Sequence, residues 1–341
     1  MQVCVVKIEK SRKESTMNKN VGAKSDLAGE FCFIFEKSNT ISCSLFKNVL
    51  NEKNTYVIHF PLAYKSNLIA KIYNRYLSKL RINCNKQKRK YHNKIVVLTN
   101  EALSVLSDEQ IYYIKKKARA IVLFFIDELF NDYVSVKRAK ELFQKKDNIF
   151  DLVYTFSDKD AKTYSIKVNH AYYSKYEANK EKSGCDIFFL GNLKNRDEIL
   201  NGTAEYFSEN NINAHYVVAA PRNKKNNKKF DYRLIPYNEN INFINSANCI
   251  FDIVDERQSG MTLRYYEAIV YNKKLLTNNV NIVNAPYYDS RYMKIYKTVD
   301  DIKNIDIGWF TRNENINYGY KSEYEPENFL KTIKIDLSQR N

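Results

Sequence analysis

The chain has 341 residues, of which 44% are hydrophobic and 28% are charged. This length predicts about two domains, and the hydrophobic content excludes a chain that is disordered throughout. Lys and Arg number 55 against 39 Asp and Glu, so the formal net charge is +16. A charge of this size favours a polyanionic partner: nucleic acid, an anionic membrane or a phosphorylated substrate. Residues 1–170 carry 31 of the basic and 17 of the acidic side chains, which concentrates the excess in the first half.

The spacings of cysteine, histidine and glycine exclude several common sites. No two of the six cysteines form a CxxC pair and the four histidines are far apart, so sequence-local zinc motifs are absent. With eight glycines, the chain contains neither GxGxxG nor a P-loop pattern. Scattered thiols suit a reducing compartment, and the first residues do not read as a signal peptide. No run approaches the roughly 18 apolar residues of a spanning helix, so we expect a soluble, cytoplasmic protein that at most rests on a membrane surface.

The first half begins irregularly and then alternates between strands and helices. Runs of β-branched and aromatic residues predict strands at 3–8, 31–35, 56–60, 94–98, 120–126 and 152–155. Helices are predicted at 107–117, where Ser107 and Gln110 form a capping box, and at 134–144. Strands that are apolar throughout indicate a parallel sheet covered by helices on both faces.

A polar segment at 171–184 predicts a linker, and a second α/β series follows it. Strands are expected at 186–190, 215–219, 232–235, 249–253 and 274–277, and helices at 197–210, 239–247 and 261–271, with a basic loop at 222–229. The sequence therefore predicts the α/β class, with two tandem Rossmann-like domains facing a cleft. The N-terminal domain takes 1–170, the linker 171–184 and the C-terminal domain 185–341. Open parallel sheets bind ligands at the carboxyl ends of their strands, so two facing sheets can hold two substrates.

The most informative stretch is 249–279, CIFDIVDERQSGMTLRYYEAIVYNKKLLTNN. A strand ends near residue 253, and a polar loop leads to Gly260 at the start of a helix. The helix N-terminus can receive a diphosphate, with Arg264 adding a forked contact. Glu267, one turn later, can accept hydrogen bonds from the two hydroxyls of a ribose. The competing interpretation is an ordinary amphipathic helix with a surface Arg–Glu pair at i,i+3.

This stretch resembles the donor-binding segment of glycosyltransferases with the two-domain GT-B fold. More closely, it is similar to a bacterial family of polysaccharide and lipopolysaccharide glycosyltransferases with the pattern LDI…QxGLTxRxxEAL…KKLITTN. The segments VLFFIDELF (122–130), LVYTFSDKDAKTYSIK (152–167) and DIFFLGNLKNRDEIL (186–200) resemble further motifs of that family. The resemblance implies donor-binding roles for nine residues: Gly191, Lys194, Arg196, Gln258, Ser259, Gly260, Thr262, Arg264 and Glu267.

The chain departs from better-known retaining GT-B enzymes at one position. They carry an acidic residue eight positions before the ribose-binding Glu, where this chain has Ser259. The departure favours transfer with inversion, which needs a general base beside the acceptor hydroxyl. Asp127 and Glu128 follow the most apolar strand of the first half and are the candidate bases, although Asp127 has helix N-capping as an alternative role. His59 and His170 are weaker candidates, since each is more typical of a structural histidine.

Asp158 and Asp160 form a DxD sequence after a predicted strand. DxD is a metal–nucleotide site in the other main glycosyltransferase fold. Here the pair follows Ser157 and opens a helix, where acidic residues simply complement the helix dipole. We prefer this capping interpretation, so the sequence predicts no metal and no cofactor, with a nucleotide-sugar as co-substrate.

Residues 53–100 contain 11 Lys and Arg and no acidic residue. Within them, 64–82 carries apolar residues at helical spacing and predicts a basic amphipathic helix. Six basic residues form the candidate membrane or acceptor surface: Lys65, Lys71, Arg75, Lys79, Lys88 and Arg89. They can face anionic headgroups, or belong to a packed helix with a solvated basic face. Nucleic acid is the third interpretation, without a supporting RNP1, helix-turn-helix or KH signature.

These features lead to an enzyme hypothesis. We expect a metal-independent, inverting glycosyltransferase that moves a sugar from a nucleotide-activated donor to a lipid-linked bacterial surface glycan such as lipopolysaccharide or capsule. It would be cytoplasmic and peripheral to the inner face of the cytoplasmic membrane. The alternatives are a nucleic-acid-binding protein that uses the basic N-terminal half, and a catalytically inactive glycosyltransferase-like scaffold.

Overall fold

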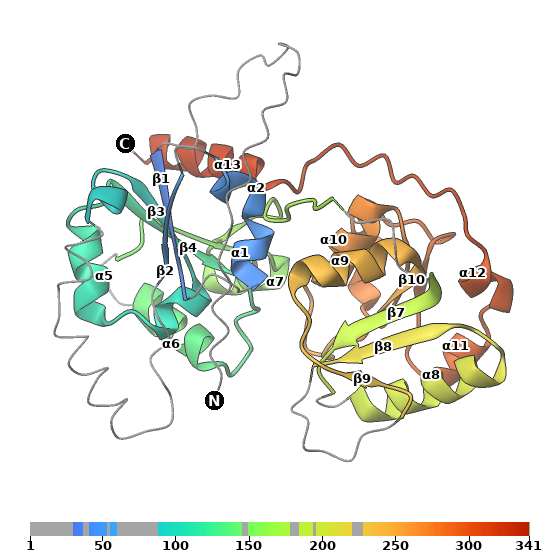
Figure 1. Ribbon diagram of the computed structural model, residues 1–341. Helices are drawn as coiled ribbons and strands as arrows, with labels where there is room; N and C mark the ends of the chain where they lie inside the picture. Colours follow the sequence, from blue (N-terminus) through green and yellow to red (C-terminus); the bar gives the residue numbers. More distant parts are fainter. Residues whose placement is uncertain are drawn as a thin grey trace, which may run out of the picture.

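The computed structural model describes residues 30–36, 41–52, 55–59, 88–144, 149–177, 184–193, 196–219 and 228–340. They form two α/β domains, each built on a six-stranded sheet (Figure 1). The fold class predicted from the sequence is confirmed. The strand predicted at 3–8, the basic helix at 64–82 and most of the loop at 222–229 lie outside the described residues.

The N-terminal sheet has the strand order β2-β1-β3-β4-β5-β6, and every neighbouring pair is parallel. Its strands are β1 (Phe31–Phe35), β2 (Tyr56–His59), β3 (Ile95–Thr99), β4 (Ala120–Phe125), β5 (Leu152–Thr155) and β6 (Lys167–Val168). β1, β3 and β4 are buried along their whole length, as parallel strands covered on both faces should be.

Helices cover both faces of this sheet. α5 (Asp108–Lys115), α6 (Val134–Gln144) and the short η2 (Asn100–Ser104) pack on one face. α1 (Ile41–Leu45), α2 (Lys47–Leu50) and the C-terminal α13 (Pro326–Ser338) pack on the other. The predicted capping box is present at α5, because the Gln110 N–H donates to Ser107 Oγ at 3.3 Å and the Ser107 N–H donates to Gln110 Oε1 at 2.9 Å.

The C-terminal sheet has the order β12-β11-β10-β7-β8-β9, again with parallel pairs throughout. Its strands are β7 (Cys185–Gly191), β8 (Ala214–Val218), β9 (Asp231–Tyr232), β10 (Ala247–Asp252), β11 (Lys274–Thr277) and β12 (Met293–Ile295). The chain runs outward from β7 to β9 and then returns to β10 on the other side of β7. This reversal makes the gap between β7 and β10 the topological switch point of the sheet.

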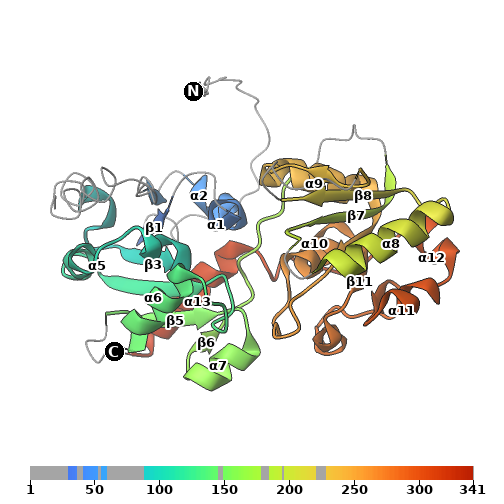
Figure 2. The same ribbon diagram turned by 90° about the horizontal axis from the view of Figure 1, so that it is seen from below.

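The two faces of the C-terminal sheet carry different helices (Figure 2). α8 (Asp197–Glu209), α11 (Val299–Lys303) and α12 (Ile307–Thr311) cover one face. α9 (Tyr237–Ser246) and α10 (Leu263–Tyr271) cover the other, and their buried side chains belong to the same apolar cluster as α2 and α13. A single core therefore runs from one domain into the other.

The chain crosses between the domains by two routes. Residues 169–177 lead from β6 toward β7 without regular secondary structure, and Tyr172, Tyr173 and Ser174 among them are buried. The segment predicted as a polar linker at 171–184 is thus packed at its beginning.

The second route is α13, which returns from the C-terminal domain to lie against the N-terminal sheet (Figure 1). The centre of the Phe329 ring lies 5.1 Å from that of Phe124 and 5.9 Å from that of Phe46. Although 185–341 was expected to be one C-terminal domain, its last helix completes the N-terminal core.

A few predicted elements differ in extent. In place of the strand predicted at 232–235, only Asp231 and Tyr232 pair with β8, and Leu234 beyond them is 83% exposed. The helix predicted from 261 begins at Leu263, because Thr262 has extended backbone as its N-cap. Among the described residues, no helix has the length and apolar character that crossing a bilayer requires.

Candidate functional site

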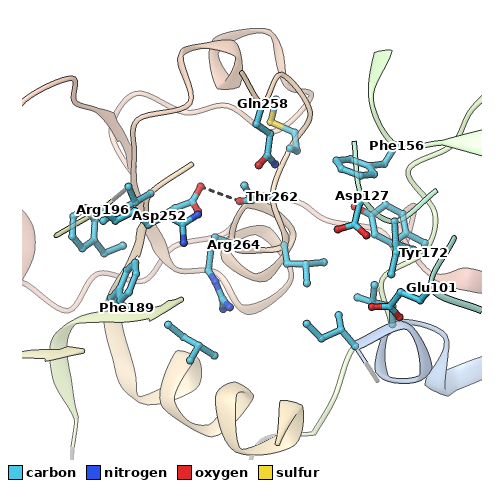
Figure 3. Close-up of a pocket in the computed structure, with 18 residues that line it drawn as sticks. Glu101, Asp127, Phe156, Tyr172, Phe189, Arg196, Asp252, Gln258, Thr262 and Arg264 are labelled. Atoms are coloured by element: carbon cyan, nitrogen blue, oxygen red, sulfur yellow. Dashed lines mark hydrogen bonds between the residues drawn. The ribbon is translucent and has the colours of Figure 1, made fainter. Parts of the chain in front are cut away.

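A cavity of about 280 Å³ lies between the domains, at the carboxyl ends of both sheets. It meets the ends of β7 and β10, which flank the switch point of the C-terminal sheet, where open parallel sheets bind ligands. Its lining forms two facing groups (Figure 3). The N-terminal wall consists of Ile41, Leu45, Glu101, Ile126, Asp127, Phe156 and Tyr172. The C-terminal wall consists of Phe189, Leu190, Arg196, Phe251, Asp252, Ile253, Gln258, Met261, Thr262, Leu263 and Arg264.

Two arginines and a helix N-terminus are the positively charged groups of the C-terminal wall. Arg196 is the N-cap residue of α8, and Arg264 lies in the first turn of α10. The Thr262 hydroxyl donates to Asp252 Oδ2 at 2.9 Å instead of capping α10. The first N–H groups of α10 therefore have no side-chain acceptor from the N-cap, and together with the helix dipole they favour an anion.

Gly191, at the end of β7, lets Arg196 lie close to the strand. A Cβ at position 191 would lie 2.9 Å from the Phe189 ring and 3.0 Å from Arg196 Nη1. The same Nη1 donates to the carbonyl of Asn192 at 3.2 Å. A larger residue at 191 would displace the guanidinium, so the contribution of Gly191 is steric.

Asp252 is a buried carboxylate of the C-terminal wall that sequence reasoning missed. It ends β10, is 6% exposed, and accepts hydrogen bonds from the hydroxyls of Thr262 and Thr277 at 2.9 and 3.0 Å. Burial raises the pKa of Asp252, and these hydrogen bonds, followed by the charges of Arg264 and Arg196, oppose the rise. The signal in the sequence was its place near the end of a buried strand, shortly before the polar loop that starts at Asp255.

Glu267 is fully buried behind Arg264. Its carboxylate accepts hydrogen bonds from the Tyr237 hydroxyl at 3.0 Å and from Asn240 Nδ2 at 2.9 Å, and it pairs with the Arg264 guanidinium. Burial raises the pKa of Glu267, and Arg264 opposes this most strongly. The i,i+3 pair that the alternative interpretation put on the surface is thus formed inside the domain. In this arrangement Glu267 orients Arg264 toward the cavity.

The N-terminal wall presents two carboxylates. Asp127 follows β4, and Asn100 Nδ2 donates to its Oδ2 at 2.9 Å. Asn100 is fully buried, and its Oδ1 accepts the Ile126 N–H at 2.9 Å, so one amide holds both the Asp127 carboxylate and the backbone directly before it. Glu101, the next residue, accepts a hydrogen bond from the Ser42 hydroxyl. Asn100 is a second residue that sequence reasoning missed.

The two neighbouring candidate bases have different positions. Asp127 lines the cavity and caps no helix, since α6 begins only at Val134. Glu128 is 2% exposed and does not line the cavity. Its carboxylate accepts hydrogen bonds from the backbone N–H groups of Ser259 and Gly260 in the other domain. The catalytic role predicted for Glu128 therefore does not fit its position, whereas that of Asp127 does.

The two histidines considered as bases lie away from the cavity lining. His170 Nδ1 is 3.1 Å from the Tyr266 hydroxyl, and His59 ends β2 beside a second, separate cavity. Burial lowers the pKa of both, and the charge of Lys90 lowers that of His59 further. Their contacts agree with structural roles.

Asp158 and Asp160 open α7 (Asp158–Tyr164), as the capping interpretation predicted. Ser157 is the N-cap, and its Oγ accepts the Asp160 N–H at 3.3 Å. The Asp160 carboxylate accepts the Leu129 N–H at 2.7 Å, and burial raises its pKa. Within the described ranges, no three His, Cys, Asp or Glu side chains gather as a metal site would require. Independence from metal stays a prediction.

The remaining predicted residues have these positions. Four of the nine donor residues line the cavity: Arg196, Gln258, Thr262 and Arg264. Outside the described residues lie Lys194 and, from the predicted basic surface, Lys65, Lys71, Arg75 and Lys79. Lys88 and Arg89 belong to a helical turn at 88–91.

Comparison with protein-family models and with curated protein sequences gives no match. Among solved structures, a UDP-N-acetylglucosamine 2-epimerase from Rickettsia bellii matches with a TM-score of 0.54 and 10% identity, over 91% of this chain and 95% of that one. The DNA-modifying enzyme beta-glucosyltransferase matches with a TM-score of 0.47 and 14% identity, over 90% of this chain and 99% of that one. At these identities the likeness shows the fold alone. That fold is the GT-B arrangement of two facing Rossmann-like domains.

The two walls suit different chemical groups of the substrates. The arginines and the α10 N-terminus can hold a diphosphate through charge-assisted hydrogen bonds. Across the cavity, Asp127 can accept a proton, with Asn100 holding its carboxylate in place. The site therefore fits an anionic substrate whose reaction needs a base.

Proposed function

We propose that the protein is a glycosyltransferase that moves a sugar from a nucleotide-activated donor to an acceptor hydroxyl. The observation that carries the proposal is the opposition of the two walls, with Arg196 and Arg264 on one side and Asp127 on the other. A nucleotide-sugar has a diphosphate that suits the first wall and a sugar that would extend toward the second.

In this proposal, the C-terminal wall stabilises the departing nucleotide. Arg196, Arg264 and the α10 N-terminus offset the charge that develops on the diphosphate as the glycosidic bond breaks. These groups do what a divalent cation would otherwise do, so we propose a reaction without metal.

The N-terminal wall activates the acceptor. Asp127 accepts the proton of the acceptor hydroxyl while its oxygen attacks the anomeric carbon from the face opposite the leaving group, which inverts the configuration. Asn100 keeps the Asp127 carboxylate oriented through the 2.9 Å hydrogen bond from Nδ2.

The acceptor is proposed to be a lipid-linked bacterial surface glycan, such as lipopolysaccharide or capsule. The support is the sequence resemblance to that family and the basic excess of residues 1–170. The protein would lie at the inner face of the cytoplasmic membrane, with basic side chains against anionic headgroups. Co-flotation with anionic but not neutral liposomes is the expected result. A DNA gel shift without any flotation would contradict it.

A second candidate is a reaction on the nucleotide-sugar itself. The fold likeness to a UDP-N-acetylglucosamine 2-epimerase, with its TM-score of 0.54, favours considering it. In that reaction Asp127 would take a proton from the sugar rather than from an acceptor. Both candidate reactions need the same diphosphate site, and they differ in whether Asp127 takes its proton from an acceptor hydroxyl or from the sugar.

Two measurements test the proposal. Thermal shift across UDP, GDP, CMP and their sugars should identify one nucleotide that stabilises the protein, and no stabilisation by any of them would remove the donor site. Proton NMR of the selected nucleotide-sugar then separates the candidates. Free nucleotide that accumulates with a glycolipid acceptor supports transfer, whereas a C2 epimer that forms without acceptor supports epimerisation.

A further inference from the structure

Two loops from different domains are hydrogen-bonded to each other beside the cavity. Residues 126–130 follow β4, and residues 255–260 precede α10. The Glu128 carboxylate accepts the Ser259 N–H, which lies 3.0 Å from Oε1 and 3.2 Å from Oε2. It also accepts the Gly260 N–H, and the Ser259 hydroxyl at 3.3 Å. We call this contact the Glu128 latch.

Glycine at 260 is what lets the two loops approach so closely. A Cβ at this position would lie 2.7 Å from the Phe156 ring and 2.8 Å from the Glu128 carboxylate. Both neighbours belong to the N-terminal domain. A side chain at 260 would therefore push the domains apart rather than disturb the C-terminal domain alone.

Further contacts across the same boundary flank the latch. The hydroxyls of Ser157 and Ser259 are 3.3 Å apart. The Arg257 guanidinium lies 4.7 Å from the centre of the Phe130 ring, within the range of a cation–π contact. The latch is thus one part of a continuous contact between the two loops.

The loop that carries Glu128 is fixed to its own domain. Asp160 Oδ2 accepts the Leu129 N–H at 2.7 Å, and Lys140 Nζ donates to the Leu129 carbonyl at 3.2 Å. Asn131 Nδ2 donates to the carbonyl of Glu128 at 3.0 Å. Because Glu128 cannot shift freely, its hydrogen bonds set the position of the loop across the boundary.

That second loop forms part of the C-terminal wall. Gln258 precedes the latched residues and Thr262 follows them, and both line the cavity. We infer that Glu128 is a positioning residue that couples closure of the two domains to the shape of the nucleotide-binding wall. The inference rests on the proposed function, since it takes this wall to be the donor site.

The latch and an occupant of the cavity should reinforce each other. The cavity exists while the latch is formed, so the two do not compete for space. On opening, the carboxylate and the two N–H groups all regain water, so the latch can form and break reversibly. A nucleotide that binds the closed form better raises its population, and a latch that favours closure raises the apparent affinity by the same factor.

The test compares four proteins: wild type, Glu128→Ala, Glu128→Gln and, as a matched control, Glu141→Gln on the exposed face of α6. UDP affinity is measured by calorimetry, and the radius of gyration by small-angle X-ray scattering. Glu128→Ala should bind UDP about tenfold more weakly and have a larger radius of gyration. Glu128→Gln keeps an acceptor oxygen and should lie between it and wild type, while Glu141→Gln should match wild type.

A variant at Gly260 keeps the Glu128 carboxylate and opposes domain closure through the volume of the added side chain. Gly260→Ala should enlarge the radius of gyration and weaken UDP binding like Glu128→Ala, which covers the case in which that variant fails to fold. Wild-type affinity and an unchanged radius in both variants would overturn the latch while leaving the donor site intact. If wild type binds none of the nucleotides of the thermal-shift screen, the donor assignment fails, and the scattering comparison still decides whether the latch holds the domains.

Discussion

The charged side chains of the two cavity walls do not follow the net charges of the halves of the chain that supply them. Residues 1–170 hold 31 basic and 17 acidic side chains, yet in the part of the chain that the structure describes, their wall contributes Glu101 and Asp127 and no Lys or Arg. Residues 171–341 are nearly balanced, and their wall contributes the two arginines of the cavity, Arg196 and Arg264, together with the buried carboxylate of Asp252.

The net charge of a domain and the charge inside its binding site are therefore separate quantities. Net charge describes the field over the outer surface of a domain, and therefore the partners that it attracts or repels. The charge within the cavity depends on the few side chains at the carboxyl ends of the strands. The basic N-terminal half can thus contribute acidic side chains to the cavity. The proposed roles of the two walls can be tested by substitutions in one wall at a time.

The largest effect is expected from the acidic wall. Asp127→Asn keeps an oxygen for the hydrogen bond from Asn100 but removes the base, so turnover should fall about 100-fold to 10,000-fold. UDP affinity should stay within about twofold, because the diphosphate is held by the other wall. Initial rates and calorimetry measure the two quantities. The control is Asp132→Asn in the same loop, with an 81% exposed side chain, and undiminished turnover of Asp127→Asn would refute its role.

The next effect is expected from the buried pair of the C-terminal wall. Arg264→Gln alone would strand the Glu267 carboxylate without its cation, which costs about 3–5 kcal/mol of stability. The double variant Arg264→Gln with Glu267→Gln avoids this and should bind UDP about 10-fold to 100-fold more weakly.

Glu267→Gln alone completes that experiment. If Glu267 acts by orienting Arg264, the single variant should lose much less UDP affinity than the double variant. An equal loss in both would instead indicate a direct contact between Glu267 and the donor, as the family resemblance implies.

A smaller effect is expected from the other arginine. Arg196→Gln removes one charged donor from the wall and should weaken UDP binding about tenfold. Raising the salt concentration should then weaken UDP binding less in the variant than in wild type, because one charge–charge interaction is already gone. The matched control is Arg312→Gln, whose side chain is 65% exposed and pairs with Asp306 away from the cavity. Equal UDP affinities of the two variants would exclude Arg196 from the site.

The smallest effect concerns stability and pH. Burial raises the pKa of Asp252 in the folded state above its value of about 3.9 in an unfolded chain, so the folded state holds this proton more tightly. The free energy of unfolding should therefore fall as pH rises from about 3.9 to the higher pKa of Asp252 in the folded state. Asp252→Asn can still accept both threonine hydrogen bonds and should show a weaker decline, with Glu267 supplying the remainder. Urea unfolding at several pH values tests this, and parallel curves for both proteins would contradict it.

The strands and their order along the chain could be predicted from the sequence because each depends on residues that are close together in the chain. Apolar runs such as 94–98, 120–126 and 152–155 have the length of a strand and indicate buried parallel strands, and β3, β4 and β5 confirm this. The capping box at Ser107 and the first turn after Ser157 are set by neighbours three residues apart.

The missed features depend on contacts between distant residues. Asn100 and Asp252 are ordinary strand-end residues until the fold brings Asp127 to one and Thr262 to the other. Nothing local distinguishes Asp127 from Glu128, because their difference arises from a backbone loop 131 residues further along the chain. The return of α13 to the N-terminal sheet likewise follows from tertiary packing and not from its own pattern.

A crystal structure of the wild-type protein with UDP would show whether the C-terminal wall binds a nucleotide diphosphate opposite Asp127. We expect the diphosphate within hydrogen-bonding distance of Arg196, Arg264 and the first N–H groups of α10, with the cavity beside Asp127 left for a sugar. A nucleotide bound elsewhere, or a diphosphate that contacts neither arginine, would show that this wall is not a diphosphate site.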